Sequence, residues 1–205
     1  MSRFYRGIKI FVGAIIRVLY RVKVINPQNE VMDKPYIVCA NHTSFMDVCA
    51  LVIAFKGQIR FMAKQEVFPV PILGWFVKSM GAFPVDRKKG DVAAIKKTID
   101  LLKNGECVGI FPQGTRRPYV NPRDTEVKDG VGMIASRAGV GVMPVFIKTK
   151  KGKLRMFRKT RVIIGEYIPP ERLVSQDGGR DKYKQITSVV FDEICSLGER
   201  TEVKW

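Results

Sequence analysis

The sequence contains little that could bind a metal ion or cross a membrane. Its 205 residues include one histidine, His42, and four cysteines without paired C-x-x-C spacing: Cys39, Cys49, Cys107 and Cys195. The small number and wide spacing of these residues nearly exclude a Cys/His zinc site, and they fit a reduced, intracellular setting better than a disulfide scaffold. No stretch reaches the roughly 18 consecutive apolar residues that a membrane-spanning helix needs.

Acidic residues are scarce as well. The 19 Asp and Glu residues are outnumbered by 36 Lys and Arg residues, which leaves a formal net charge of +17. An excess of this size points to a polyanionic partner, such as nucleic acid, an anionic membrane surface or phosphorylated small molecules. The chain has no recognisable RNA- or DNA-binding motif, and its aromatic residues lie in apolar runs rather than among the basic ones. Both observations argue against nucleic acid.

The chain does have enough apolar residues, 46%, for a sizeable core, and its length is typical of one compact domain. Strands are expected at residues 35–40, 59–62, 106–111, 142–147 and 161–167, and helices at 45–55, 91–103, 130–138 and 183–197. This alternation predicts an α/β fold, a layered mixed sheet flanked by helices. In such folds, sites gather at the carboxyl ends of strands.

Residues 4–21 show the pattern of a helix with two unlike faces. The apolar face gathers Phe4, Ile8, Phe11, Val12, Ile15, Val18 and Leu19, and the basic face Arg3, Arg6, Lys9, Arg17 and Arg21, with Ile10 as the main misfit. Such a helix is typical of one lying among the headgroups of anionic lipid, although the pattern fits a helix docked on its own domain equally well. Because the charge balance favours lipid, we expect an amphipathic membrane-association helix at residues 1–21 and one domain at residues 22–205.

The first candidate site loop follows the strand at 35–40. It contains His42, the only candidate for a histidine general base. Asp47 lies five residues later, about 500° around a regular helix, so the side chains meet only if His42 precedes the helix and Asp47 lies in its first turns. Ser44 is a good N-cap and permits this arrangement. The simpler alternative is that Asp47 only completes a capping box.

Residues 111–117 form a second candidate loop. Gly114 lets a ligand approach the backbone closely, and the guanidinium groups of Arg116 and Arg117 can bind phosphate oxygens. Arg87 is a third basic position. Each of these short motifs alone is more often an ordinary solvated turn, so only their combination is informative.

The combination resembles a known family, the lysophosphatidic acid acyltransferases (1-acylglycerol-3-phosphate O-acyltransferases) of the glycerolipid acyltransferase superfamily. The similar blocks, in the family's order, are the H-x4-D block at 41–47, the second at 81–87, the third at 111–116 and the fourth, a Pro within a strand, at 142–145. The likeness extends over about residues 22–167. One difference is Gln113, where the family usually has Glu; the amide can still hydrogen-bond a glycerol hydroxyl but supplies no charge.

The resemblance implies transfer of a fatty acyl group from an acyl thioester to the free hydroxyl of lysophosphatidic acid, which gives phosphatidic acid in phospholipid biosynthesis. The thioester would be acyl-CoA or acyl-carrier protein. His42 would take the hydroxyl proton while Asp47 holds the imidazole ring. Because the hydroxyl attacks directly, no acyl-enzyme is expected, nor is a metal or other cofactor.

The resemblance also assigns binding contacts. The acceptor phosphate would be bound by Lys64, Arg87 and Arg116, and the acceptor glycerol by Gln113, Gly114 and Thr115. The acyl chain needs an apolar slot, for which we expect some of Phe68, Ile72, Leu73, Trp75 and Phe76. Ordinary core packing explains each of these five at least as well.

The expected partners are an anionic membrane, with the protein peripheral or monotopic on the cytoplasmic face of the cell membrane, the acyl thioester and the lysophospholipid. The basic run at residues 148–161 could attract a carrier protein or headgroups, or be a solvated hairpin. One alternative keeps the reaction but takes glycerol-3-phosphate or another lysophospholipid as acceptor. A more distant alternative is a non-catalytic basic protein that binds membrane or nucleic acid.

Overall fold

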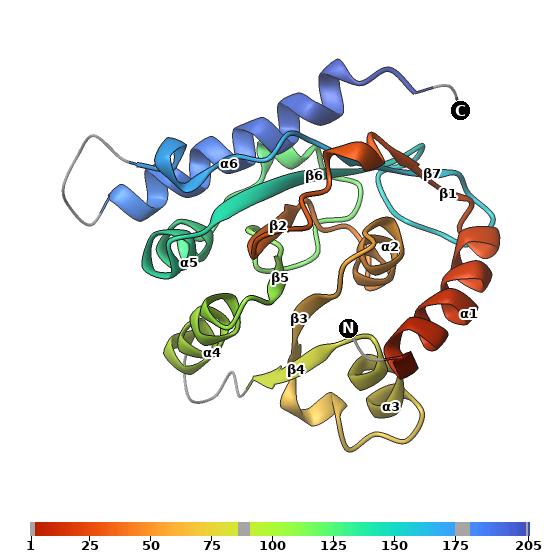
Figure 1. The fold of residues 1–205 in the computed structure, drawn as a ribbon. Coiled ribbons are helices and arrows are strands. Elements are labelled where there is room, and N and C mark those ends of the chain that lie inside the picture. Colours follow the sequence, from red (N-terminus) through yellow and green to blue (C-terminus); the bar gives the residue numbers. More distant parts are fainter. Residues whose placement is uncertain (1–2, 86–90, 175–180, 204) are drawn as a thin grey trace.

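The computed structural model describes residues 3–85, 91–174, 181–203 and 205, which form a sheet with helices on both faces (Figure 1). In these residues the strands are β1 (Val22–Ile25), β2 (Tyr36–Ala40), β3 (Ile59–Lys64), β4 (Ala82–Val85), β5 (Cys107–Ile110), β6 (Gly141–Thr149) and β7 (Thr160–Ile164). The helices are α1 (Arg3–Leu19), α2 (Asp47–Ala54), α3 (Leu73–Ser79), α4 (Asp91–Lys103), α5 (Gly130–Ala138) and α6 (Lys182–Arg200). The strand order is β1-β7-β6-β2-β5-β3-β4, and neighbouring strands are parallel except for β6 and β7.

The centre of this sheet is buried on both faces. All five residues of β2 are buried, as is usual for a parallel strand with helices on each side. Successive side chains of a strand point to opposite faces, so Val38 packs with Leu51 of α2 in one core cluster. Ile37 packs in the other cluster with Ile134 of α5 and Ile194 of α6. The predicted α/β fold, a mixed sheet flanked by helices, is confirmed.

The bounds of α4 and α5 are those that the sequence predicts, whereas the sequence pattern does not indicate β1, β4 or α3. β1 and β4 are edge strands of four residues each. β4 contains Pro84, which an edge tolerates because one side of the strand needs no backbone donor. Such short edge strands lack the long apolar run that marks a central strand.

α1 packs along α2, and its N-terminal end lies beside α3 (Figure 1). Tyr5 and Ile16 are buried in the same core cluster as α2. A Cβ atom placed on Gly81, two residues after α3, would lie 3.5 Å from the Tyr5 ring. The helix at the start of the chain is therefore docked on the rest of the domain.

Two basic residues of α1, Lys9 and Arg17, donate hydrogen bonds to the rest of the protein. The Nζ atom of Lys9 donates to the carbonyl oxygens that follow α2, those of Phe55 (2.5 Å), Lys56 (3.0 Å) and Gly57 (3.0 Å). Arg17 donates to the carbonyl oxygen of Ile53 at 3.0 Å. The last carbonyl groups of a helix lack partners within it and carry partial negative charge, so cations stabilise them.

The outward side of α1 is largely apolar. Four side chains at helical spacing, which we call the α1 stripe, are exposed: Ile10 (68%), Phe11 (71%), Ile15 (45%) and Val18 (74%). Ile10, the misfit of the sequence pattern, belongs to this stripe. The two alternatives for this segment are thus compatible, because the helix docks on its domain and still presents apolar residues to the outside. Among the described residues, no helix has the length and apolar character to span a bilayer.

Candidate active site

The loop between β2 and α2 brings His42 and Asp47 together. Nδ1 of His42 lies 2.9 Å from Oδ2 of Asp47; the carboxylate is fully buried and the imidazole is 16% exposed. The backbone N–H groups of Thr43 and Ser44 donate to the same Oδ2 at 2.5 and 2.7 Å. An ionised carboxylate only accepts hydrogen bonds, so the contact places the ring proton on Nδ1 and leaves Nε2 for a substrate. α2 begins at Asp47 with Met46 as its N-cap residue, so Ser44 is not the N-cap that the sequence predicts, although its N–H donates to Asp47 as in one half of a capping box.

Asn41 fixes the start of this loop. Its buried side chain donates to the carbonyl oxygen of Ile147 on β6 at 3.1 Å and accepts from the N–H of the same residue at 2.7 Å. The amide thereby continues the pairing of β2 with β6 one residue beyond the strand. The sequence assigns Asn41 no role, because its partner lies 106 residues away.

Phe111 supports the face of the His42 ring. The two rings are stacked, with centroids 3.9 Å apart and planes 15° apart, and Phe61 lies 6.1 Å beyond Phe111. A flat contact of this kind restricts rotation of the imidazole. Together with Asp47 it defines where Nε2 points.

Gln113 holds the backbone of His42 and does not line the site, which differs from its expected contact with glycerol. Its side chain is 4% exposed, and its Oε1 accepts from the N–H of His42 at 2.7 Å. Its Nε2 donates to Oγ1 of Thr125 at 2.7 Å, and that hydroxyl donates to the carbonyl oxygen of Pro122 at 2.6 Å. The N–H of Arg117 donates to the carbonyl oxygen of His42 at 2.8 Å. The loop at 111–117 thus clamps His42 from both sides of its backbone.

A cavity of about 550 Å³ lies beside the His42 ring. Four residues expected at the site line it together with His42: Lys64, Gly114, Thr115 and Arg116. Asp47 lies behind the ring, and Arg87 falls outside the described residues. The structure therefore places a base and two cations around one hollow.

The apolar wall of this cavity differs from the expected acyl slot. It includes Phe45, Val48, Phe61, Met62, Val67, Phe76 and Val77. Of the five expected residues only Phe76 is among them; Phe68 lines a different hollow. Ile72, Leu73 and Trp75 are exposed by 84%, 37% and 56%. The chain turns outward at Ile72, where φ is +63°, so this apolar segment faces away from the core.

The backbone conformation at position 114 favours glycine. Its φ is +67°, and a Cβ atom there would lie 2.9 Å from Cε of Lys128. A smaller hollow of about 380 Å³ adjoins the cavity at this point and has Gly114 and Phe111 in common with it. Any larger residue at position 114 would narrow both hollows.

The wall of the cavity also contains the thiol of Cys49. Burial and, to a lesser extent, the neighbouring carboxylate of Asp47 raise the pKa of this thiol to about 12. It is therefore protonated at neutral pH and is a poor nucleophile. Within the described residues, no group of three or more His, Cys, Asp or Glu side chains is placed to hold a metal ion.

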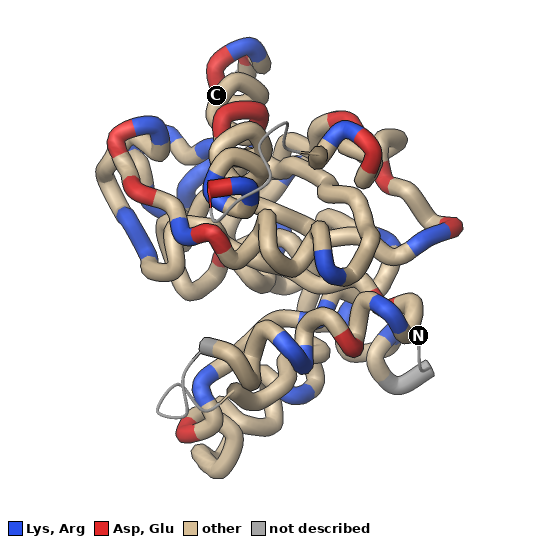
Figure 2. Tube along the Cα trace, turned by 90° about the vertical axis from the view of Figure 1, so that its left-hand side faces the viewer, with Lys and Arg blue, Asp and Glu red and all other residues tan. Residues whose placement is uncertain are grey.

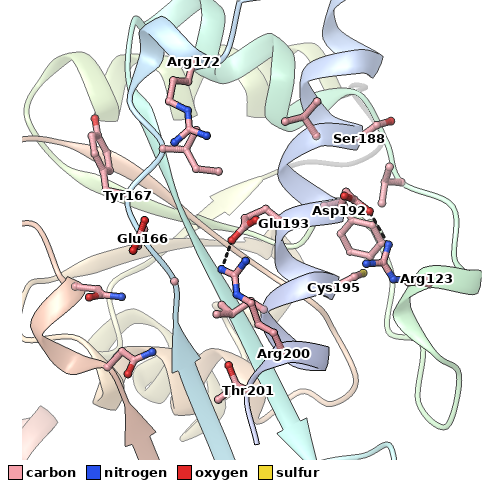
Figure 3. A pocket seen from close by; sticks show the side chains of 18 of the residues that line it. Arg123, Glu166, Tyr167, Arg172, Ser188, Asp192, Glu193, Cys195, Arg200 and Thr201 are labelled. Atoms are coloured by element: carbon pink, nitrogen blue, oxygen red, sulfur yellow. Dashed lines mark hydrogen bonds and ion pairs between the residues drawn. The ribbon is translucent and has the colours of Figure 1, made fainter.

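A larger hollow, about 1190 Å³, lies elsewhere, between α6 and the segment after β7 (Figure 3). Its charged side chains are largely paired with each other. Arg123 contacts Asp192 and Arg200 contacts Glu193, as the dashed lines show. None of the residues expected at the site lines this hollow.

Comparison with known proteins identifies a matching family and similar sequences. A family model described as Acyltransferase matches residues 21–148, which include both candidate loops. The 1-acyl-sn-glycerol-3-phosphate acyltransferase of Bacillus subtilis (strain 168) is 36% identical over 148 residues, 71% of this chain and 72% of that protein. The protein of the same name from Streptococcus pneumoniae (strain ATCC BAA-255 / R6) is 38% identical over 115 residues, 55% of this chain. The chain spans only 41% of that relative and 38% of a chloroplastic one from Arabidopsis thaliana.

A solved structure is similar over the whole chain. It is the crystal structure of the 1-acyl-sn-glycerophosphate (LPA) acyltransferase, PlsC, from Thermotoga maritima. The TM-score is 0.65 at 27% identity, and the match covers 100% of this chain and 86% of that one. The likeness therefore includes the sheet and both loops that carry the candidate site.

Proposed function

This chain belongs to the acyltransferase family and is PlsC-like, and from that premise we propose a reaction for it. A fatty acyl group moves from an acyl thioester to the free hydroxyl of lysophosphatidic acid, which gives phosphatidic acid in phospholipid biosynthesis. One observation carries the proposal: the His42–Asp47 pair lies at a cavity that Lys64 and Arg116 also line. An oriented base next to phosphate-binding cations suits an acceptor that is both an alcohol and a phosphate ester.

The transfer is direct. Nε2 of His42 takes the hydroxyl proton as the acceptor oxygen attacks the thioester carbonyl carbon. The C–S bond breaks, the ester forms, and the departing sulfur receives the proton from the imidazolium. Asp47 stabilises the imidazolium and holds its tautomer. The protonated thiol of Cys49 offers no competing nucleophile, and no metal ion or cofactor takes part.

The acceptor is bound by its phosphate and its glycerol. Lys64 and Arg116 bind the phosphate, joined by Arg87 from outside the described residues. The backbone at Gly114 and the hydroxyl of Thr115 contact the glycerol. Support comes from the cavity, which four of these five residues line.

The donor is an acyl thioester, acyl-CoA or acyl-carrier protein, whose acyl chain lies against the apolar wall at Phe61 and Phe76. Both donors are anionic and suit a chain of net charge +17. An acyl chain also needs the exclusion of water, which apolar lining supplies.

The test is an acyl-transfer assay with the purified chain. The parent protein and the His42→Ala variant are incubated with lysophosphatidic acid and labelled acyl-CoA or acyl-carrier protein, and the product is identified by mass. We expect phosphatidic acid from the parent and a loss of at least about a thousandfold in rate from the variant. Unchanged transfer by a folded His42→Ala protein would falsify the role of the dyad.

A second acceptor is tested in the same assay. Glycerol-3-phosphate or another lysophospholipid presents a similar alcohol and phosphate, so each is supplied in place of lysophosphatidic acid. The preferred acceptor is the one with the highest kcat/KM. We expect lysophosphatidic acid to be preferred, because the relatives from Bacillus subtilis and Streptococcus pneumoniae bear its name.

We also propose that the protein lies on an anionic membrane through the α1 stripe, as a peripheral or monotopic protein on the cytoplasmic face. The four exposed apolar side chains of the stripe and the positive net charge support this contact. The four cysteines are free thiols, as in a reducing compartment. The acceptor, a single-chain lipid, would then be taken from the same membrane.

A further inference from the structure

The loop between β6 and β7 ends in two large apolar side chains between two arginines. Met156 is 47% exposed and Phe157 is 69% exposed, with Arg155 before them and Arg158 after them. We call these four residues the 155–158 tip. Phe157 has a φ of +59°, which is uncommon for a bulky residue. Backbone conformations of this kind cluster at functional sites.

The 155–158 tip lies at the C-terminal end of the α1 stripe. The N–H of Phe157 donates to the carbonyl oxygen of Leu19, the last residue of α1, at 2.5 Å. Val18, 74% exposed, is the stripe residue next to this contact. The exposed apolar surface of α1 is therefore continued by the tip.

A second apolar side chain projects near the other end of α1. Ile72 is 84% exposed, and the N–H of Leu73 donates to the carbonyl oxygen of Pro71 at 2.6 Å, which closes a γ-turn of the rarer, positive-φ kind around Ile72. Trp75, on the adjoining α3, is 56% exposed. α3 lies beside the N-terminal end of α1 (Figure 1), so Ile72 and Trp75 add exposed apolar side chains near that end of the helix.

The chain around the tip carries only positive charge. Between Val131 and Gly165 the sequence has no Asp or Glu and nine cations: Arg137, Lys148, Lys150, Lys151, Lys153, Arg155, Arg158, Lys159 and Arg161. Residues 1–29, which include α1, also lack Asp and Glu, whereas acidic residues lie among the basic ones in other parts of the chain (Figure 2). Apolar projections flanked by cations match an anionic lipid surface, which offers hydrocarbon below and phosphate above.

The loop that carries the 155–158 tip contacts Tyr119, close in sequence to the cavity-lining residues. Arg155 donates to the hydroxyl of Tyr119 at 2.7 Å, and Nζ of Lys153 lies 5.9 Å from the centre of the same ring. The N–H of Tyr119 donates to the carbonyl oxygen of Gly152 at 2.9 Å. Tyr119 follows Arg116 by three residues. The loop that carries the tip is thus joined to the loop that lines the cavity.

We propose that the 155–158 tip inserts into the interface of an anionic lipid bilayer, with Met156 and Phe157 among the acyl chains and Arg155 and Arg158 on lipid phosphates. With the α1 stripe and Ile72 it fixes the orientation of the cavity relative to the membrane. A bilayer fits better than an acidic protein, because separate projections along a helix enter a fluid surface without a matching shape. The inference rests on the membrane contact proposed for α1, but its main test, binding to vesicles, needs no acyl transfer.

The test is sedimentation of the full chain with vesicles of phosphatidylcholine that contain phosphatidylglycerol. We expect Phe157→Ser to weaken binding about tenfold, since an aromatic side chain leaves the hydrocarbon. Arg155→Gln and Arg158→Gln should each weaken it about fivefold, and only with the anionic vesicles. The matched control is Val92→Ser on α4, which is 78% exposed on the other face of the sheet and should change binding less than about twofold.

A second measurement guards against a folding artefact. A Phe157→Trp variant is made in a background without the two native tryptophans, and its fluorescence should be quenched by vesicles of brominated lipid, whereas the fluorescence of Val92→Trp should not be.

Equal binding of Phe157→Ser and the parent to vesicles, or an equal loss of binding in Val92→Ser, overturns the proposal. So does a defect of the arginine variants that is confined to transfer from acyl-carrier protein, because it would make the tip a protein-docking site. Failure of the parent to transfer acyl groups would refute the proposed reaction and leave the vesicle result standing.

Discussion

The two ends of α2 are stabilised in different ways. At the N-terminal end, Asp47 accepts from the backbone of Thr43 and Ser44 and contacts the ring of His42, all within five residues of itself. At the C-terminal end, the carbonyl oxygens are bound by Lys9 and Arg17 of another helix, 36 to 48 residues away. One end carries the candidate chemistry, and the other joins the candidate membrane helix.

One short helix, α2, therefore connects the candidate active site with the candidate membrane helix. α2 has eight residues, about 12 Å of length. Its polarity suits a carboxylate at the first end and cations at the second, because the helix dipole is positive at its N-terminus and negative at its C-terminus. Variants at the first end should alter catalysis, whereas variants at the second end should alter stability and leave catalysis largely intact.

The largest effect is expected from Asp47→Asn. The N–H groups of Thr43 and Ser44 and Nδ1 of His42 all contact Oδ2, so the amide oxygen of the variant takes that place and keeps the ring tautomer, but the negative charge that stabilises the imidazolium is lost. Because general-base catalysis contributes about 10²–10⁴-fold and depends on this charge, we expect kcat to fall by at least about a hundredfold with little change in thermal stability. Transfer of labelled acyl groups to lysophosphatidic acid measures it.

The control for this variant is Thr43→Val. It removes the 3.3 Å contact from the Thr43 hydroxyl to the other carboxylate oxygen and leaves the histidine contact in place. We expect less than about a tenfold loss, because a neutral hydrogen bond contributes about 1 kcal/mol. If Asp47→Asn lost no more activity than Thr43→Val, the carboxylate would have only its capping role.

These local contacts are also what the sequence could predict. The spacing of Ser44 and Asp47 implies a helix start at which His42 and the carboxylate can meet, and the helix Asp91–Lys103 ends where Asn104-Gly105 predicts. Contacts with distant backbone leave no such pattern. The backbone partners of Asn41 and Gln113 lie 106 and 71 residues away. The sequence therefore predicts no role for Asn41, and the family resemblance predicts a contact with glycerol for Gln113.

The orientation of α1 on the domain cannot be predicted from the sequence for a related reason. The partners of Lys9 and Arg17 are carbonyl groups, which every residue has, so no complementary side chain marks the contact in the sequence. With apolar residues on more than one side of α1, periodicity alone does not show which side of the helix contacts the protein. The exposure of Ile72 and Trp75 likewise depends on one outward turn of the chain, which apolar composition does not encode.

The second largest effect is expected from Gln113→Ala, which extends the comparison to the clamp on His42. The variant leaves the N–H of His42 without its acceptor, and a lost hydrogen bond of a buried group costs about 1–3 kcal/mol. We expect kcat to fall about thirtyfold while KM for lysophosphatidic acid changes less than about threefold. A residue that bound glycerol would mainly raise KM, and that outcome would restore the original expectation for Gln113.

Rescue by Gln113→Glu tests the same clamp. A carboxylate accepts from the N–H of His42 as the amide does, and the Thr125 hydroxyl can turn from Pro122 to donate to it. We expect kcat within about fivefold of the parent, because only one neutral hydrogen bond is exchanged. A Glu variant as impaired as the Ala variant would show that the amide NH₂ group, rather than the acceptor, is what matters.

At the other end of α2, Lys9→Met keeps the apolar stem and deletes the ammonium group. Three carbonyl groups lose their charged donor, so we expect the free energy of unfolding to fall by about 1.5–2 kcal/mol in urea titrations. Burial lowers the pKa of Lys9 below its usual value, so the unfolded chain binds the extra proton. The stability of the parent relative to the variant should therefore rise as the pH passes from that lowered pKa towards about 10.5. A difference in stability that did not vary over this range would contradict the buried contact.

The smallest effect is expected from Arg17→Met, a second variant at the C-terminal end of α2. Arg17 makes one contact, to Ile53, and its side chain is exposed, so the hydrogen bond competes with water and contributes about 0.5 kcal/mol. Its positive charge also opposes that of Lys9, whose pKa it lowers further. Each single variant relieves the same repulsion, so the double variant should be destabilised by a few tenths of a kcal/mol more than the sum of the two single-variant losses at low salt, and this excess should shrink as salt is added. Strict additivity at low salt would mean that the two cations stabilise α2 independently, and catalysis should be near that of the parent in all three variants.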